Sequence, residues 1–387
     1  MRLRTFCKKE DGAVAVIVAI SMTVLFGFTA LAMDYGMMAA EKQSMQNAVD
    51  AAALAAAMDI GAKKYSTAYN TAKDFCADNG YAISDTVTLS FETTAKTATV
   101  TLTKTMRQGF SAVLTGEKEQ TVSATATAEA VSLFHEYPYA ILAGKKIEDQ
   151  GVGIAVYGND HPKVYGSIHS NSNISFADVT VTGGTVTARG SIQPPIRDGQ
   201  DHCGESLDVP PISTFDNVMK NVPVVEFSGD YTLNGTTCFK TLLDDAYRKY
   251  ANSGYSTADL NTSGMVIHIS GNMTFNGWNP TPIRRTYPVT LIVDGNVSLN
   301  GAPLQGSLDY PVYVISKNGN VTMSGGVLDF FGIIYAPNGD VKFDGINVNF
   351  IVSIIAQKFY KNGGTFDLRY NADIDRFLPS TKVHLIA

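Results

Sequence analysis

A seven-residue pattern that recurs five times in the second half of the chain constrains the fold more than any other feature. The pattern is Gly-[Asp/Asn]-x-[Thr/Ser/Lys]-x-[Asn/Ser/Asp]-Gly, and its copies span residues 229–235, 271–277, 295–301, 319–325 and 339–345. The last four copies start at residues 271, 295, 319 and 339, so they follow one another at intervals of 24, 24 and 20 residues. A period of this size is typical of a solenoid, in which each coil stacks on the next.

Each copy has the composition of a short strand between two bends. The Gly-Asn or Gly-Asp pair favours a turn, and the residues after it alternate in polarity, as the apolar Val321 and Met323 illustrate. The third and later copies also follow a β-rich apolar run, such as residues 289–293. Two or more strands in a coil of about 20 to 24 residues suit a parallel β-helix. We therefore predict a mainly β chain whose largest part, residues 136–370, is a parallel β-helix (solenoid).

The N-terminal region contains a candidate membrane anchor. Residues 13–33 include no Lys, Arg, Asp or Glu, and as a helix they would be ~30 Å long, which matches the hydrocarbon core of a bilayer. Basic residues precede this segment, whose N-terminal side is therefore expected in the cytoplasm; they are Arg2, Arg4, Lys8 and Lys9. We predict a cytoplasmic N-terminus (1–12), a single transmembrane helix (13–33) in the cytoplasmic membrane, and an extracytoplasmic main domain.

A cleaved secretory signal is the alternative interpretation of the same segment, with residues 30–32 (Ala-Leu-Ala) as the cleavage site. The apolar run is longer than the roughly 7 to 15 residues of a signal-peptide core, which favours the anchor. The Ala-rich sequence after it continues the helical pattern, so we predict a helical stem over residues 34–62.

A small α+β module is predicted between the stem and the solenoid, over residues 63–135. A helix should begin at Tyr65 and end at Asn79-Gly80, and alternating residues predict strands at 87–91, 98–103 and 121–126. Most residues of these strands are Thr or Ala, so the module buries only a modest core.

Three N-terminal elements together resemble a known family. These elements are residues 12–17 (Gly-Ala-Val-Ala-Val-Ile), residues 34–36 (Asp-Tyr-Gly) and residues 46–57, which begin Gln-Asn-Ala-Val-Asp. They resemble the N-terminal signature of TadE/TadG-like proteins of tight-adherence (Tad, or Flp-type) pilus systems, over about the first 60 residues. The resemblance implies a pilin-like α+β module, a role in pilus assembly or surface display, and pilus-assembly proteins or pilin subunits as partners.

The resemblance also raises cleavage by a prepilin peptidase after Gly12. Processed prepilins of this type are similar in carrying a Glu five residues after the cleavage Gly, whereas this chain has Ile17 at that place. We therefore expect the chain to keep its basic N-terminus and to stay in the membrane.

Two proline pairs mark an insertion into the solenoid, predicted over residues 193–262. Proline cannot donate to a strand ladder, so Pro194-Pro195 and Pro210-Pro211 indicate loops that leave the coils. Cys203 and Cys238 lie in this insertion and can form a disulfide that closes a loop of about 35 residues; unpaired thiols remain open, because Cys76 is left over. Residues 371–387 are predicted to be a C-terminal cap or tail that closes the end of the solenoid.

The sequence shows no familiar catalytic or metal-binding motif. It contains no Cys-x-x-Cys, no His-Glu-x-x-His and no Walker-type loop. The carboxylates considered are Asp230, Asp294, Asp340 and Asp344. At the second position of the repeat Asp exchanges with Asn, which suits a turn residue that hydrogen-bonds its own backbone better than an acid. His169 lies among Ser and Asn residues, which suits a structural ladder better than a sugar or metal site; His161 and His268 have less support still. We expect no enzymatic activity, no cofactor and no metal site.

The low charge content, 17% with a formal net charge of −6, includes no basic patch and argues against nucleic acid as a partner. We predict a membrane-anchored, non-enzymatic component of a Tad/Flp-type pilus system that displays an extracytoplasmic β-helix for assembly, adhesion or surface contact. The alternative is a membrane-tethered β-helical protein that binds or cleaves cell-wall or extracellular polysaccharide.

Overall fold

The structure is a computed structural model, and it describes the chain from Glu10 to Ile386 with short gaps. The gaps are residues 63, 95, 110–111, 113–115, 147, 149–150, 159–161, 178, 195–200, 204–205, 220–222, 256–259, 261–263, 278–284, 302–303, 305, 326, 376–377 and 379. The chain divides into two compact units. Unit 1 comprises residues 1–60, 65–129 and 383–387, and unit 2 comprises residues 61–64 and 130–382.

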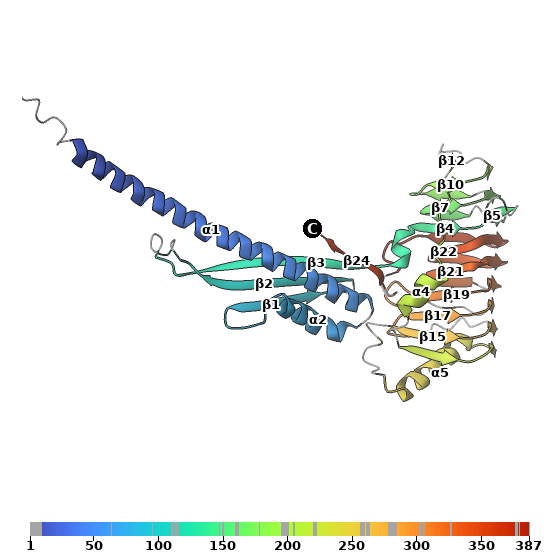
Figure 1. The fold of residues 1–387 in the computed structure, drawn as a ribbon. Helices are drawn as coiled ribbons and strands as arrows, with labels where there is room; N and C mark the ends of the chain where they lie inside the picture. Colours follow the sequence, from blue (N-terminus) through green and yellow to red (C-terminus); the bar gives the residue numbers. More distant parts are fainter. Residues whose placement is uncertain are drawn as a thin grey trace, which may run out of the picture. The chain divides into compact units, whose positions relative to one another are not determined.

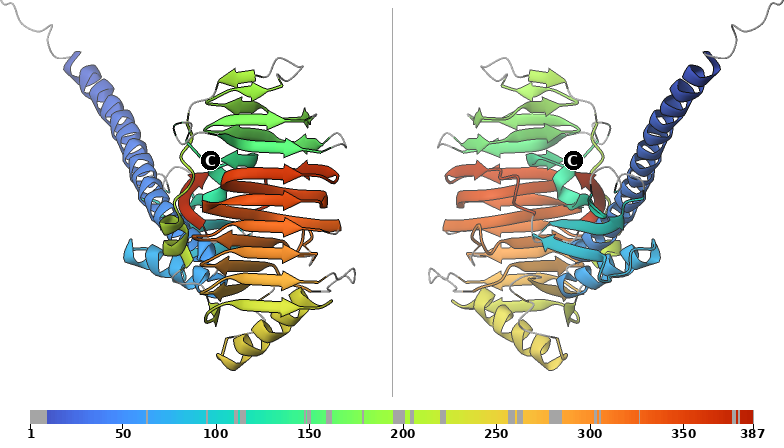
Figure 2. Two further views of the ribbon diagram at one scale, coloured as in Figure 1. Left: turned by 90° about the vertical axis from the view of Figure 1, so that its right-hand side faces the viewer. Right: turned by 90° about the vertical axis from the view of Figure 1, so that its left-hand side faces the viewer.

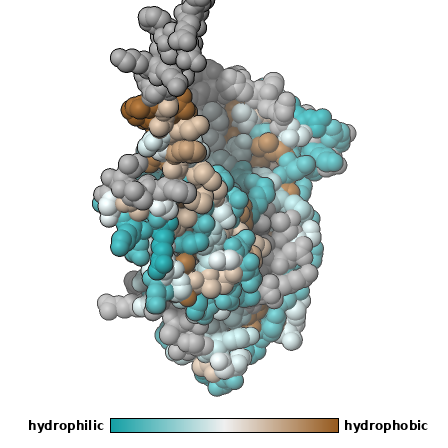
Figure 3. Space-filling view, turned by 60° about the vertical axis from the view of Figure 1, so that its left-hand side comes forward, coloured by the Kyte–Doolittle hydropathy of each residue, from teal (hydrophilic) through white to brown (hydrophobic). Residues whose placement is uncertain are grey.

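One continuous helix, α1 (Glu10–Gly61), holds both the predicted membrane segment and the predicted stem. Its 52 residues give a length of ~78 Å at 1.5 Å per residue. The large apolar side chains from Val14 to Met33 are exposed, and Figure 3 shows apolar residues at the surface along this part of the helix. Among the described residues, α1 is the one helix long and apolar enough to cross a membrane.

The second half of α1 packs into unit 1 and does not stand alone as a stem. Its small and apolar side chains are fully buried, among them Met45, Ala48, Ala52 and Ala56. Unit 1 also contains α2 (Tyr65–Asp78) and the antiparallel strands β1 (Val87–Thr93), β2 (Thr97–Arg107) and β3 (Glu119–Ser132). In β2 and β3 the Thr side chains point outward, and the hydroxyl oxygens of Thr99 and Thr127 lie 2.9 Å apart across the two strands. The inward Ala and Val side chains are small, so a helix can lie close to the sheet.

A fourth strand completes the unit 1 sheet and corrects the predicted C-terminal cap. β24 (Ser380–Ile386) lies beside β3, in the order β1-β2-β3-β24. The last residues therefore belong to the sheet of unit 1 and do not close the end of the repeats. Unit 2 is consequently inserted in the chain between two neighbouring strands of one sheet.

Unit 2 is built on a 20-stranded sheet whose described pairings are all parallel, which confirms a mainly β chain with a parallel sheet. We call it the parallel stack. Its N-terminal run contains β4 (Tyr139–Ala143), β5 (Val152–Tyr157), β6 (Lys163–Tyr165), β7 (Ser167–Ser170), β8 (Asn173–Phe176), β9 (Thr180–Thr182), β10 (Val186–Ala188), β11 (Ile192–Gln193) and β12 (Asp201–Cys203). Its C-terminal run contains β13 (Val224–Phe227), β14 (Tyr231–Asn234), β15 (Met265–Ile269), β16 (Met273–Asn276), β17 (Val289–Val293), β18 (Val297–Asn300), β19 (Val312–Ser316), β20 (Val321–Ser324), β21 (Val327–Asp344), β22 (Asn347–Asn362) and β23 (Phe366–Arg369).

The two runs join in an order that differs from the order of the sequence. The last coil of the C-terminal run pairs with the first coil of the N-terminal run, through β22 with β4 and β5 and through β23 with β6. Figures 1 and 2 show the red strands of the C-terminal run lying against the green strands of the N-terminal run. The chain thus enters and leaves the stack in its middle, and β12 and β13 form its two ends.

The predicted insertion over residues 193–262 is corrected by this order. Three of its segments, β12, β13 and β14, are strands of the stack. What connects the runs is a return segment, residues 206–219, which includes helix α4 (Ile212–Met219). Helix α5 (Cys238–Asn252) buries one face at the β13 end of the stack, with Phe239, Leu242 and Tyr250 buried.

The apolar residues of unit 2 form two clusters. The larger cluster lies between the strand columns and includes Phe275, Phe343 and Phe359. The second lies on the outer face of β15, β17, β19, β21, β22 and β4, where the return segment covers it. Strands such as β17 are therefore buried on both faces, which explains why their sequences are continuous apolar runs.

Close stacking of the coils explains the first glycine of the repeat. A Cβ added to Gly319 would lie 2.4 Å from the carbonyl carbon of Gly295 in the neighbouring coil, and one added to Gly339 would lie 1.9 Å from the carbonyl oxygen of Gly319. Only glycine allows the backbones to approach this closely.

Candidate functional site

The second residue of each repeat forms a ladder of hydrogen bonds that joins successive coils. The side-chain oxygen of Asn272 accepts from the backbone N–H of Asn296 at 2.8 Å, and Asn296 accepts in turn from Asn320 at 2.8 Å. Asp230 and Asp340 occupy the two ends of the ladder. Asn and Asp exchange here because both supply an oxygen acceptor. The acceptor serves the next coil, and not the residue's own backbone as predicted.

A second ladder lies at the sixth position of the repeat. The Asn276 amide donates to Asn234 at 2.9 Å, and the Asn300 amide donates to Asn276 at 2.7 Å. Farther along, the Asn362 amide donates to the Asp344 carboxylate at 3.3 Å. The carboxylates of Asp230 and Asp344 therefore have structural partners, whereas Asp340 joins the ladder through its backbone N–H.

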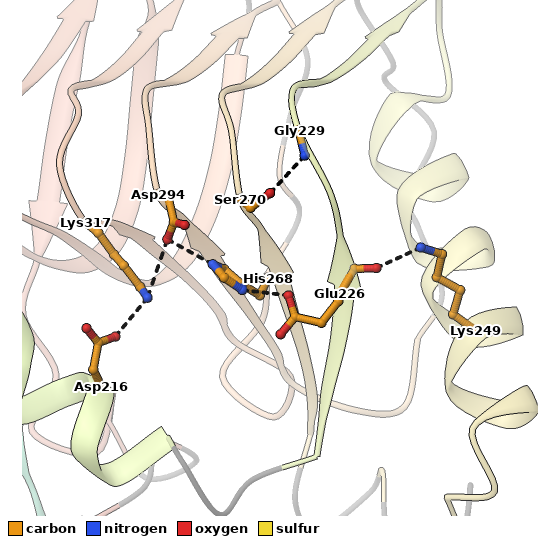
Figure 4. A network of polar contacts seen from close by, with 8 residues as sticks. All are labelled: Asp216, Glu226, Gly229, Lys249, His268, Ser270, Asp294 and Lys317. Carbon is orange, nitrogen blue, oxygen red and sulfur yellow. Dashed lines mark hydrogen bonds and ion pairs between the residues drawn. The ribbon is translucent and has the colours of Figure 1, made fainter.

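A charge ladder lies on the other strand column, at the ends of β13, β15, β17 and β19 (Figure 4). His268 Nδ1 lies 2.7 Å from Glu226 Oε2, and His268 Nε2 lies 2.9 Å from Asp294 Oδ1. Lys317 Nζ lies 3.4 Å from the same Asp294 oxygen and 2.9 Å from Asp216 Oδ1 on α4. Acidic and basic residues thus alternate along successive coils, and the last pair ties the return segment to the stack.

The electrostatics of the charge ladder favour the ionised forms of Asp294 and Lys317. Burial disfavours ionisation of Asp294, but the hydrogen bonds and charges of His268 and Lys317 outweigh it and hold its pKa below 3.8. Burial likewise opposes the charge on Lys317, while Asp216 and Asp294 outweigh that effect and raise its pKa above 10.5. At neutral pH the Lys317 ion pairs are therefore formed.

The charge ladder does not have the geometry of a catalytic site. Both ring nitrogens of His268 face carboxylates, so neither is directed at a substrate, and a general base needs a free nitrogen within hydrogen-bond reach. The Ser270 hydroxyl accepts from the Gly229 N–H at 2.9 Å. Across the described residues, no group of His, Cys, Asp and Glu could hold a metal ion.

His169 lies in a separate, buried polar cluster of the N-terminal run. It is 2% exposed; its Nδ1 lies 2.7 Å from Thr187 Oγ1, and its Nε2 lies 3.0 Å from Asn171 Oδ1. Burial lowers the pKa of His169, and the hydrogen bond with Asn171 opposes that shift only in part. These partners are those of a structural ladder. His161 lies outside the described residues.

An open groove of about 540 Å³ lies on the outward face of the stack, where the two runs join. The residues lining it are Val152, Ala155, Tyr157, Asn320, Thr322, Asp340, Lys342, Lys358, Phe359 and Tyr360. Sequence reasoning did not find this groove or the charge ladder, because both depend on which coils are neighbours. For the charge ladder a signal existed: Glu226 and His268 occupy the same outward position of consecutive coils.

The predicted disulfide between Cys203 and Cys238 is wrong for this fold. Cys203 ends β12 at one end of the stack, and Cys238 begins α5 at the other end. Nine strand spacings, from β12 through β10, β7, β4, β22, β21, β19, β17 and β15 to β13, separate the two ends, which is roughly 40 Å at 4.7–4.9 Å per spacing. A disulfide requires Cα atoms less than about 7 Å apart. Cys238 is a buried free thiol, as is Cys76.

The N-terminal site, Gly12, lies within helix α1, two residues after the helix begins. Cleavage after this residue stays a prediction. Residues 1–9 lie outside the described part of the chain.

Comparison with known proteins identifies one segment. Residues 12–59 match a family described as "Putative Flp pilus-assembly TadE/G-like". No curated protein and no solved structure gives a match. The family match starts at Gly12 and ends within α1, so it covers the apolar half of the helix and the half that packs into unit 1. Residues 12–59 are therefore similar to TadE/G-like Flp pilus-assembly proteins, as the N-terminal residues predicted.

Proposed function

We propose that this protein is a membrane-anchored, non-enzymatic component of a Tad/Flp-type pilus system, which holds unit 2 outside the cytoplasmic membrane. One observation carries the proposal: the family match at residues 12–59 falls on α1. The same helix exposes an uncharged apolar surface long enough to cross a bilayer. The pilus-related segment and the candidate anchor are thus a single element.

The orientation follows from the charges that flank this segment. Four basic residues precede it, at positions 2, 4, 8 and 9, and such residues are retained on the cytoplasmic side. Unit 2 would then lie outside the membrane, in the periplasm or at the cell surface.

We further propose that the parallel stack is a β-helix that serves as a contact surface. Its support is the arrangement of the strands in three columns, which β4, β5 and β6 begin and β7, β8 and β9 continue in the next coil. The outward residues of one column form regular polar ladders. A rigid, repetitive face of this kind suits contact with pilin subunits, with the cell wall or with another surface during adhesion.

Two experiments test the proposal. Protease added to spheroplasts should digest residues beyond Asp34 in cells with an intact membrane, while a cytoplasmic marker protein stays whole. Deletion of the gene should reduce surface Flp pili, and the full chain should restore them. A chain in which a cleavable signal peptide replaces residues 1–33 is the matched control and should not. Protection of unit 2 from the protease would exclude the orientation, and normal pili in the deletion strain would exclude the pilus role.

A further inference from the structure

The groove at the join of the two runs combines aromatic and charged side chains that the membrane anchor and the ladders do not require. Its lining comes from β20, β21, β22 and β5, which are successive neighbours in the stack. The pairing of Tyr360 with Ala155 crosses the join. The groove therefore exists only because the C-terminal run stacks on the N-terminal run.

A small side chain, between larger ones on the neighbouring strands, creates the hollow. Ala155 stands in register between Tyr360 on β22 and Ser175 on β8. Tyr157 and Tyr360 rise beside it; each is 37% exposed, and their ring centroids lie 6.0 Å apart with the rings edge to face. The Tyr157 hydroxyl lies 3.2 Å from the Ser175 hydroxyl, which holds this ring in place.

Hydrogen-bond donors and acceptors line the same hollow. Asn320, Thr322 and Asp340 contribute amide, hydroxyl and carboxylate groups. Lys342 is engaged by Asp344 at 3.1 Å and lies 5.8 Å from the centre of the Tyr360 ring. Lys358 is different, since among the described residues no carboxylate forms an ion pair with it.

We propose that this groove binds a short stretch of acidic polysaccharide. The faces of half-exposed Tyr rings suit the C–H surface of a sugar ring, and mixed donors and acceptors suit its hydroxyl groups. The Lys358 ammonium supplies a charge-assisted hydrogen bond for a sugar carboxylate. A volume of about 540 Å³ lies within the roughly 300–1,000 Å³ range of ligand sites. The groove binds the chain of sugars without making or breaking a bond.

This inference deepens the proposed role of the stack as a contact surface, and rests on it only for its biological meaning. Binding can be measured on purified protein without reference to the membrane. A protein that binds the sugar but whose unit 2 is protected from external protease would keep the site and exclude the proposed function.

Titration calorimetry of the full chain in detergent micelles tests the site, with an alginate tetrasaccharide as the acidic probe and cellotetraose as its neutral counterpart. We expect the uronate to bind more tightly than the neutral sugar. Lys358→Gln should weaken uronate binding about tenfold, and Tyr360→Ala should weaken the binding of both sugars about tenfold. Lys240→Gln is the matched control, because Lys240 lies on α5 and pairs with Asp244 at 2.5 Å; it should leave both affinities unchanged.

Three results would overturn the proposal. They are no binding of either sugar by a chain with normal thermal unfolding, equal affinity for the two sugars, and equal effects of Lys358→Gln and Lys240→Gln. If Tyr360→Ala lowers the unfolding temperature, Ala155→Leu replaces it, since this change fills the hollow and keeps every charge. Unchanged uronate affinity in a folded Ala155→Leu variant would also exclude the groove as the site.

Discussion

The two runs of the parallel stack share the same columns of strands but hold their turns in different ways. In the C-terminal run, one Asn or Asp per coil accepts a hydrogen bond from the next coil, at 2.7 to 2.8 Å throughout. In the N-terminal run the accepting residue changes from turn to turn: Asn173 accepts from the Ser191 N–H at 2.8 Å, Ser167 accepts from the Thr185 N–H at 3.2 Å, and a buried polar cluster surrounds His169. A repeat is visible in the sequence only where every coil uses the same contact. The N-terminal run also stacks in parallel, with register shifts in β4 and β5, because its interior is apolar as well.

The largest expected effect concerns the glycines at which neighbouring coils touch, which occur in both runs, as Gly319 and Gly184 show. Gly319→Ala places a Cβ against the backbone of Gly295, and we expect it to lower the unfolding free energy of the C-terminal run by about 3 kcal/mol or more. Gly183→Ala is the control at an open position, where nothing lies within 4 Å and only the φ of +70° is unfavourable; it should cost about 1 kcal/mol. Hydrogen exchange of the full chain measures both. Equal costs would show that close coil contact is not what requires glycine at position 319.

The ladder of hydrogen bonds at the second position of the repeat should contribute less to the unfolding free energy. Asn296→Leu removes the acceptor for the Asn320 N–H, and we expect a loss of about 1–2 kcal/mol because a backbone donor loses its partner. Asn296→Asp keeps the oxygen and should cost less than about 0.5 kcal/mol. The measurement is urea unfolding of each variant. If Leu and Asp cost the same, the ladder does not stabilise the C-terminal run.

The smallest expected effect is a difference in pH response. His169 has a pKa lowered below 6.5, so the unfolded chain binds a proton more readily, and the N-terminal run should lose stability as pH falls below 6.5. Asp294 has a pKa lowered below 3.8, so its contribution is present above that value and is lost only as pH falls through the folded pKa. Because the charge ladder is partly exposed, it should contribute no more than about 1 kcal/mol.

Hydrogen exchange between pH 7 and 4, corrected for the intrinsic rate, measures this response in each run. Protection of β7 and β10 should fall, while β15 and β17 stay protected. His169→Gln is the control, since it removes the titration and should flatten the response of the N-terminal run. Simultaneous loss of protection in both runs would contradict the assignment.

The sequence predicted the elements whose cause is local. The period of the repeats predicted parallel strands, the uncharged residues 13–33 predicted a long apolar helix, and Asn79-Gly80 marks the place where α2 ends, with Gly80 at a φ of +89°. Alternation of Thr with Ala or Val predicted β1, β2 and β3. In each case neighbouring residues along the chain decide the structure.

The order of the coils could not be predicted, because periodicity is the same whichever coils are neighbours. Pairing of β22 with β4 joins residues such as Ile354 and Ile141, and no local pattern encodes such a distance. The groove, the charge ladder and the separation of Cys203 from Cys238 all follow from that order. The strand β24 was missed because it is short, with seven residues, Ser380–Ile386, of which more than half are polar. Its partner β3 also lies far away in the sequence.

The sheet of unit 1 is complete only once β24 has been synthesised. Synthesis proceeds from the N-terminus, so β3 is made well before its neighbour β24. The edge of β4 likewise remains open until β22 has emerged. A chain that stops early therefore leaves two strand edges unpaired, and exposed edges invite aggregation and degradation. A truncated product can thus be recognised by the open edge of its first sheet.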